Sequence, residues 1–264
     1  LFRRQRQMCI RDRVYTVADR STRIRLSPEP QIQTRSAPVA RDKQHQDSGQ
    51  GDREIMAIET ILCYGDSNTW GWNPATEARY ARDERWPGVL RRELGEGVLV
   101  IEEGLNGRTT VWEDPIEGYK NGKEYLIPCL ESHKPIDLVI IMLGTNDLKM
   151  RFHVPACDIA AGAGALVDIV AKSEAGPGNL APRVLLITPP PLARLSEYAE
   201  MFEGGAVKSR WLGHHFRLVA AERGCALLEA SEVIASSDVD GIHLALSEHQ
   251  KLGEAVAVRV RQML

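Results

Sequence analysis

The sequence lacks the signatures of several protein classes. Its five cysteines include no Cys-x-x-Cys pair, and their odd number argues against a disulfide framework. The seven histidines show neither His-x-His nor His-Glu-x-x-His spacing, so we predict no metal site and no cofactor. No apolar run is long enough to span a bilayer, and the first residues lack the apolar stretch of a secretory signal. We therefore expect a cytoplasmic protein with no membrane partner.

Charge is distributed unevenly along the chain. Residues 1–55 hold 12 Lys/Arg against 7 Asp/Glu, whereas residues 56–264 hold 21 against 29. The first segment lacks hydrophobic periodicity and is expected to be disordered, because it buries too little apolar surface to offset the entropy of ordering. A basic arm of this kind is compatible with a nucleic-acid tether. The string QMCIRDR, however, resembles the in-frame translation of a transposase sequencing adaptor, so we expect residues 1–55 to be non-native sequence and predict no nucleic-acid partner.

From Met56 onward, short apolar runs alternate with helical patterns. Several of the runs are apolar at consecutive positions, as strands covered on both faces must be. This alternation predicts one α/β domain over residues 56–264, a three-layer α/β/α sandwich with a flavodoxin-like five-stranded parallel sheet. The expected strands are 57–65, 98–104, 136–144, 183–189 and 225–230, and the expected helices are 84–94, 155–173, 206–223 and 247–264, the last with Ser247 as its N-cap.

Polar clusters follow each expected strand or precede the closing helix, where ligands bind in parallel sheets. The clusters read GDSNTWGW, LNGRTT, GTND, PPPLARL and DGIH. Singly, none is specific. Asp66 and Ser67 are compatible with simple helix capping, Gly107 with a turn that needs positive φ, and His243 with a surface histidine after an Asp-Gly turn.

Together and in this order, the clusters resemble those of the SGNH hydrolases, serine esterases and acyltransferases named for residues in four blocks. The corresponding residues here are Ser67, Gly107, Asn146 and His243. The resemblance covers nearly all of residues 58–264 and is greatest to bacterial arylesterase-like acyltransferases, through strings such as GDSNTWGW, IEEGLNGRTT and LVIIMLGTND. Asn68 departs from the pattern, because many relatives have Leu there.

Acyl transfer requires an activated nucleophile. An alcohol is a poor nucleophile at neutral pH, so Ser67 needs a base, and His243 has Asp240 three residues earlier to orient its ring. The short Asp-x-x-His spacing differs from α/β-hydrolases, where the acid lies far from the histidine. The resemblance further implies an oxyanion hole formed by the backbone N–H groups of Ser67 and Gly107 and the side-chain amide of Asn146.

The substrate pocket is expected to be apolar. We predict that Trp72 and Trp70 bind acyl chains or aryl leaving groups, with Leu192 as a further wall; the alternative is that both indoles pack in the core. We group Asp66 with this side of the site and expect it to hold the nucleophile turn by accepting backbone hydrogen bonds. For Arg108, next to Gly107, the two alternatives are contact with a polar end of the substrate and a surface ion pair, and we favour the surface ion pair.

These features predict a serine esterase or acyltransferase without cofactor or metal. It would form an acyl-enzyme from short-chain or aryl esters and transfer the acyl group to water, alcohols or peroxide. The alternatives are a carbohydrate or lipid acyl esterase on the same fold, or a catalytically silent binding protein. The resemblance also implies a homo-oligomer, with residues 200–216 resembling the insertion and helix that relatives use for subunit contacts.

Overall fold

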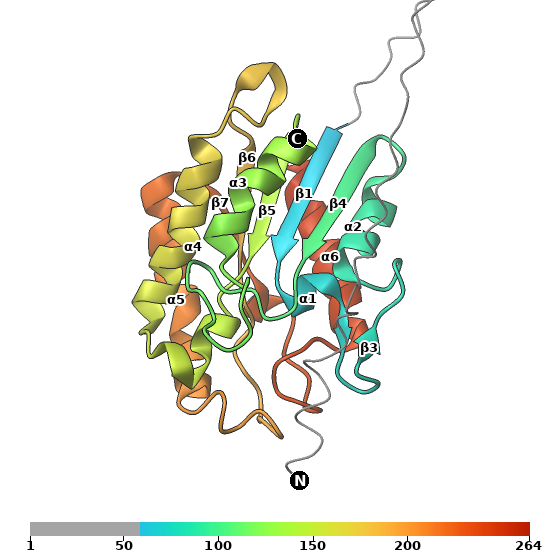
Figure 1. Ribbon diagram of the computed structural model, residues 1–264. Coiled ribbons are helices and arrows are strands. Elements are labelled where there is room, and N and C mark those ends of the chain that lie inside the picture. The colour runs from blue at the N-terminus through green and yellow to red at the C-terminus, as the bar shows by residue number, and fades with distance from the viewer. Residues whose placement is uncertain (1–58) are drawn as a thin grey trace, which may run out of the picture. The chain divides into compact units, whose positions relative to one another are not determined.

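The computed structural model describes residues 59–264 (Figure 1). The predicted non-native segment, residues 1–55, lies outside the described residues. In the described part, five parallel strands form one sheet in the order β4-β1-β5-β6-β7, which is the flavodoxin-like order. The predicted fold class is therefore confirmed. The strands are β1 (Glu59–Gly65), β4 (Val98–Gly104), β5 (Leu138–Met142), β6 (Arg183–Thr188) and β7 (Ala226–Glu229).

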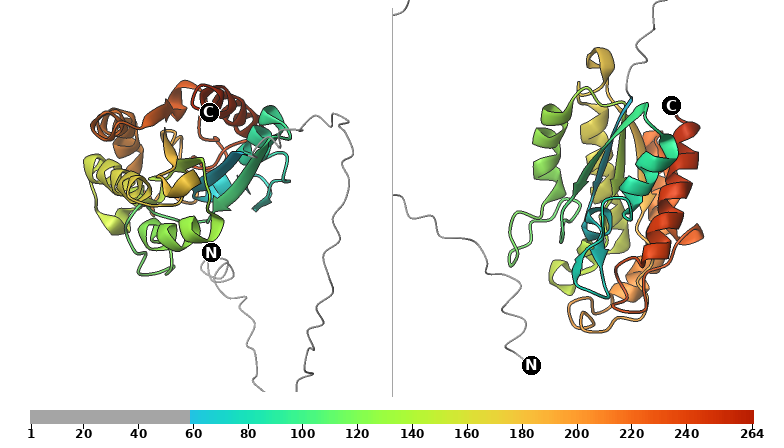
Figure 2. Two further views of the ribbon diagram at one scale, coloured as in Figure 1. Left: turned by 90° about the horizontal axis from the view of Figure 1, so that it is seen from above. Right: turned by 90° about the vertical axis from the view of Figure 1, so that its right-hand side faces the viewer.

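Helices cover both faces of this sheet (Figure 2). One face packs against α2 (Trp86–Leu94) and α6 (Leu246–Arg261), and the other against α3 (Gly122–His133), α4 (Ala156–Ala171) and α5 (Gly205–Arg223). Alternate residues of β1 show why this strand is continuously apolar. Ile61 and Cys63 join the core cluster of α2 and α6, whereas Leu62 and Tyr64 join that of α3, α4 and α5, and all four are fully buried.

Short elements lie mostly near the carboxyl ends of the strands. The helix α1 (Ser67–Trp70) follows β1 directly, and the hairpin of β2 (Trp72–Asn73) and β3 (Ala78–Arg79) comes next. The remaining short elements are the 3-10 helices η1 (Asn146–Leu148), η2 (Met150–Phe152), η3 (Pro177–Asn179) and η4 (Ala230–Glu232). None of the helices within residues 59–264 is both long and apolar enough to cross a membrane.

The start of α6 and the presence of α3 differ from expectation. The predicted N-cap at Ser247 is wrong, because α6 already begins at Leu246 with Ala245 at its N-cap. The Ser247 hydroxyl instead contacts the neighbouring Glu248 carboxylate, 3.3 Å away. The helix α3 was not expected from the sequence, since Pro128 interrupts its pattern; its start is set by Asn121, whose side chain accepts a hydrogen bond from the Lys123 N–H.

Candidate active site

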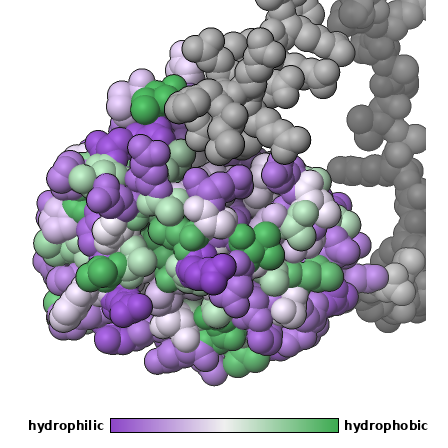
Figure 3. Space-filling model, turned by 90° about the horizontal axis from the view of Figure 1, so that it is seen from below, coloured by the Kyte–Doolittle hydropathy of each residue, from purple (hydrophilic) through white to green (hydrophobic). Residues whose placement is uncertain are grey.

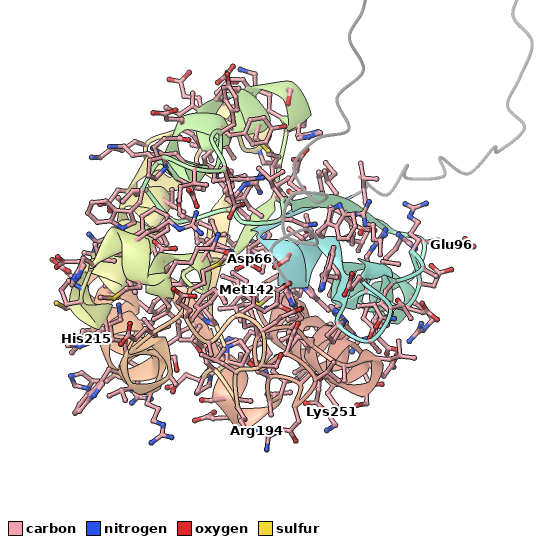
Figure 4. All side chains as sticks on the ribbon, turned by 60° about the horizontal axis from the view of Figure 1, so that its bottom comes forward. Asp66, Glu96, Met142, Arg194, His215 and Lys251 are labelled. Carbon is pink, nitrogen blue, oxygen red and sulfur yellow. The ribbon has the colours of Figure 1, made fainter. Side chains whose placement is uncertain are left out.

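The turn after β1 positions Ser67. The strand ends at Gly65, Asp66 occupies the N-cap of α1, and its Oδ1 accepts a hydrogen bond of 2.9 Å from the Asn68 N–H. Ser67 is therefore the first helical residue, at the carboxyl edge of the sheet. Figure 4 brings this edge forward and shows Asp66 beside Met142, the last residue of β5, in agreement with the register that pairs Gly65 with Met142.

Three side chains from opposite ends of the domain meet at this edge. Ser67 Oγ lies 2.9 Å from His243 Nε2, and His243 Nδ1 lies 2.6 Å from Asp240 Oδ2. The other carboxylate oxygen of Asp240 accepts hydrogen bonds from the backbone N–H groups of Ile242 and His243, at 2.9 and 3.0 Å. The structure thus brings together the hydroxyl, imidazole and carboxylate that the family resemblance and the Asp-x-x-His spacing predicted to meet.

The electrostatics of the triad keep Asp240 ionised. Burial opposes its charge, but the hydrogen bond and charge of His243, with the two backbone N–H donors, outweigh burial and hold the pKa of Asp240 below its ordinary value. An ionised Asp240 accepts a hydrogen bond from the Nδ1–H group of His243 and so holds the proton on that nitrogen. The Nε2 atom is then free to accept the proton of the Ser67 hydroxyl, which is the arrangement a general base requires.

The loop that carries His243 is also anchored to the nucleophile turn. Asn68 Oδ1 accepts a hydrogen bond of 3.1 Å from the Leu244 N–H, and Asn68 Nδ2 donates to the Ile242 carbonyl at 3.4 Å. These contacts lie on either side of His243. The sequence identified Asn68 as a departure from the family pattern, but its partners lie far along the chain and only the fold reveals them.

The segments that carry Gly107 and Asn146 are joined by hydrogen bonds. Asn146 Nδ2 donates to the Arg108 carbonyl at 3.1 Å. One residue further along the second segment, both carboxylate oxygens of Asp147 lie 3.1 Å from the Thr110 N–H, and the Thr110 hydroxyl also contacts Asp147. Gly107 adopts a φ of 81°, and a Cβ there would lie 2.5 Å from Glu117 Oε2, so a side chain at this position would be strained.

The expectation of a surface ion pair at Arg108 is wrong. The residue is only 2% exposed, and its Nη1 donates to the carbonyls of Gly65 and Glu103, at the ends of β1 and β4. Its guanidinium group lies 4.1 Å from the centroid of the Tyr64 ring. Arg108 therefore donates hydrogen bonds to two backbone carbonyls near the ends of neighbouring strands. The sequence does not indicate that these carbonyls require a donor.

A family model decides the assignment. Residues 63–249 match the model of the GDSL-like lipase/acylhydrolase family. The chain belongs to this family of SGNH hydrolases. The hydrolase resembles the solved native aryl esterase of M. smegmatis, with 44% identity and a TM-score of 0.75 over 78% of this chain and 100% of the other. A carbohydrate acetylesterase from Sinorhizobium meliloti shows 41% identity and a TM-score of 0.76, with the same coverage.

A third solved structure, a putative arylesterase from Agrobacterium tumefaciens, shows 39% identity and a TM-score of 0.72, again over 78% of this chain and 100% of the other. A search of curated proteins found no match. Family and structural neighbours together identify a serine ester hydrolase.

Two aromatic rings, those of Trp72 and Tyr198, lie near the His243 ring in this hydrolase. The Trp72 ring lies 5.8 Å from the His243 ring, and the Trp70 ring lies 6.2 Å from that of Trp72. The Arg79 guanidinium group stacks on Trp70 at 4.7 Å. Tyr198, half-buried and 6.5 Å from the His243 ring, was not predicted from the sequence because no spacing marks it. Hydrophobic residues lie among hydrophilic ones on the face shown in Figure 3.

The other two residues predicted near the substrate are buried. Leu192 is 6% exposed and belongs to the core cluster beneath α4 and α5, so its part in a pocket stays a prediction. Asp66 is 1% exposed; burial raises its pKa to about 6, although the Asn68 N–H and the charge of His243 oppose the rise. Its hydrogen bond to Asn68 agrees with the expected holding of the nucleophile turn.

Proposed function

We propose that the protein is a serine esterase and acyltransferase that forms an acyl-enzyme on Ser67 from short-chain or aryl esters. The acyl group then passes to water, an alcohol or a peroxide. The observation that supports this most is the continuous hydrogen-bonded chain from Asp240 through His243 to the Ser67 hydroxyl, closed at distances of 2.6 and 2.9 Å.

In the proposed mechanism, His243 accepts the Ser67 proton as the Ser67 oxygen attacks the acyl carbon. The imidazolium ion, stabilised by Asp240, then protonates the leaving alcohol, and the same steps run with the acceptor in the second half. We assign stabilisation of the developing oxyanion to hydrogen bonds from the backbone N–H groups of Ser67 and Gly107 and from the side-chain amide of Asn146. That amide has two N–H donors, one of which holds the Arg108 carbonyl. Removing one oxyanion donor typically costs about 10²–10³ in turnover.

We attribute the preference between water and alcohol as acceptor of the acyl group to the aromatic rings near His243. The rings of Trp72 and Tyr198 offer apolar surface to an acyl or aryl group and leave fewer polar partners for water near the acyl-enzyme. The Trp70 ring packs near that of Trp72, and the Arg79 guanidinium group lies over the Trp70 ring. This apolar lining favours transfer to alcohols such as benzyl alcohol.

A carbohydrate acetylesterase is the second candidate, because one solved structure at 41% identity carries that description. A lipid acyl esterase on the same fold shares every proposed catalytic residue. The family assignment argues against a catalytically silent binding protein. A homo-oligomer and a cytoplasmic location stay predictions from the sequence.

Product analysis separates these functions. p-Nitrophenyl acetate is incubated with the protein in water containing increasing benzyl alcohol, and benzyl acetate and acetate are quantified. The proposal predicts a rising share of benzyl acetate with an unchanged rate of acyl-enzyme formation, and neither product above background with Ser67→Ala. Only free acid at every alcohol concentration would remove the transferase assignment. Faster deacetylation of an acetylated sugar than of the aryl ester would favour the second candidate.

A further inference from the structure

A second group of ligating side chains lies outside the hydrolase site, between β4 and α3. Glu103 on β4 and Cys129 and His133 on α3 bring a carboxylate oxygen, a sulfur and an imidazole nitrogen within 4.8 Å of one another. His133 Nε2 and Glu103 Oε1 are 2.9 Å apart. The cluster contains none of the residues assigned to ester hydrolysis, so a function of this cluster is independent of the proposed esterase activity.

The helix arranges two of these groups in advance. Cys129 and His133 are four residues apart within α3, so they project from the same helix face about one turn from each other. Glu103 meets them from the sheet, one residue before the end of β4. An ion pair explains why His133 approaches Glu103, and the four-residue spacing on α3 brings the Cys129 sulfur to the same place from the core side.

The three side chains of the cluster are buried to different extents. Cys129 is fully buried, whereas the side chains of His133 and Glu103 are 29% and 21% exposed. The His133 and Glu103 side chains are therefore partly open to solvent, whereas the Cys129 sulfur faces the cluster from the protein interior. Three protein ligands with one open side leave a fourth position for water, which completes the tetrahedral coordination that zinc prefers.

The local charge is compatible with a cation. Glu103 and a metal-bound Cys129 thiolate supply two negative charges. The guanidinium group of Arg108, which donates hydrogen bonds to the carbonyls of Gly65 and Glu103, supplies one nearby positive charge and leaves the cluster with a net negative charge. Lys134, which follows His133, pairs with Glu131 at 2.7 Å.

We propose that Glu103, Cys129 and His133 form a Zn²⁺ site with water as the fourth ligand. Sulfur and imidazole ligands select zinc over Mg²⁺ and Ca²⁺, which take oxygen ligands. A bound ion would link strand β4 to helix α3. This proposal departs from the sequence-based prediction of no metal site: the Cys-x-x-x-His spacing within CLESH supplies two of the ligands, and the fold supplies the third.

Cobalt binding tests the site. The full-length protein, stripped with a chelator, is titrated with Co²⁺ and then with Zn²⁺ as competitor. We expect one equivalent of Co²⁺, a thiolate-to-cobalt charge-transfer band, and displacement of Co²⁺ by Zn²⁺. Cys129→Ser should abolish the band. His133→Gln should weaken binding by more than the roughly 10–100-fold that is typical for loss of a partner of a metal ligand.

Matched variants identify the ligands. Cys157→Ser removes an exposed thiol and His215→Gln removes a histidine on α5, and both should keep the band and the affinity. Ser67→Ala should also keep both, which separates this site from the hydrolase site. Absence of a stoichiometric band in the wild-type protein, or unchanged affinity in His133→Gln, would overturn the proposal. The His133 variant decides the case if the buried Cys129→Ser variant fails to fold.

Discussion

At the scale of single residues, Asn68 connects the candidate nucleophile Ser67 with the candidate base His243. It follows Ser67 directly, and its side chain contacts the backbone on both sides of His243, at the Ile242 carbonyl and the Leu244 N–H. Asn68 is 1% exposed, so water does not replace these hydrogen bonds if they are lost. The side chain is thus a positioning residue for His243.

Substitution of Asn68 tests this role. Asn68→Leu introduces the residue that many relatives have, but it leaves the buried Leu244 N–H unpaired, at a cost of about 1–3 kcal/mol. We expect kcat for p-nitrophenyl acetate to fall about tenfold while KM changes little. Steady-state kinetics and Tm are measured for Asn68→Leu and Asn68→Ala. Wild-type kcat in the Leu variant together with a loss in the Ala variant would assign Asn68 to packing instead.

The buried carboxyl groups of Asp147 and Asp66 make the free energy of unfolding depend on pH. Burial raises the pKa of Asp147 from 3.8 to about 6, although its hydrogen bonds with Thr110 oppose the rise, and burial raises the pKa of Asp66 similarly. Between about pH 4 and 6, each folded carboxyl binds its proton more tightly than its unfolded counterpart. The free energy of unfolding contributed by these groups therefore falls as pH rises through this window. Asp240, whose pKa is lowered, acts in the opposite sense at lower pH.

Asp147→Asn removes one of these titrations. We expect the free energy of unfolding of the wild type, minus that of the variant, to fall by about 1–3 kcal/mol between pH 4 and 7. Urea denaturation at several pH values measures this difference. A difference that is constant with pH, or that rises with it, would show that Asp147 is already ionised at pH 4 in the folded protein.

At the scale of elements, the loop between η4 and α6 holds Asp240 and His243 by packing on the loop after β6. The Ala193 N–H donates to the Gly241 carbonyl at 2.9 Å. Gly241 has a φ of 81°, and a Cβ there would lie 2.7 Å from the Arg194 carbonyl oxygen. No side chain fits without moving one loop from the other.

A pair of glycine substitutions tests this contact. Gly241→Ala should lower both Tm and kcat, because it adds a backbone clash to the about 1–2 kcal/mol cost of a left-handed conformation. Gly224→Ala, at the end of α5, has positive φ but nothing within 4 Å of the added Cβ. It should therefore lose some stability and keep kcat. Equal kcat in the two variants would contradict the proposed role of loop packing.

The sequence predicted most of the sheet but only part of the network around the site. Consecutive apolar positions, as in β5, mark strands covered on both faces, and the polar clusters marked the strand exits. The helix α3 was missed because Pro128 obscures its pattern, and Arg108 was misplaced because the carbonyls it serves belong to two separate strands. Tyr198 reaches His243 only through the tertiary fold. Local periodicity is readable in sequence, whereas contacts between distant segments without a motif are not.

At the scale of the whole molecule, three large apolar side chains remain exposed along one face of α5. Val207, Trp211 and Leu218 recur at helical spacing and are 66%, 59% and 56% exposed. The sequence placed the predicted subunit contact in residues 200–216, which include two of them. A second copy of the chain is the expected partner for this face.

The oligomer prediction is checked by light scattering. Trp211→Glu places a charge in the apolar face and should reduce the molar mass from that of an oligomer to that of a smaller species, without loss of secondary structure. Lys172→Glu, on the exposed end of α4, serves as a charge-changing control and should leave the mass unchanged. A monomeric wild-type protein would contradict the prediction.

The most direct test of the central claim is the site of acylation. The protein is mixed briefly with p-nitrophenyl acetate, quenched with acid, and examined by intact mass and peptide mapping. The account predicts one acetyl group on Ser67, and none in Ser67→Ala. Acetylation at another residue, or turnover by Ser67→Ala at the wild-type rate, would contradict it.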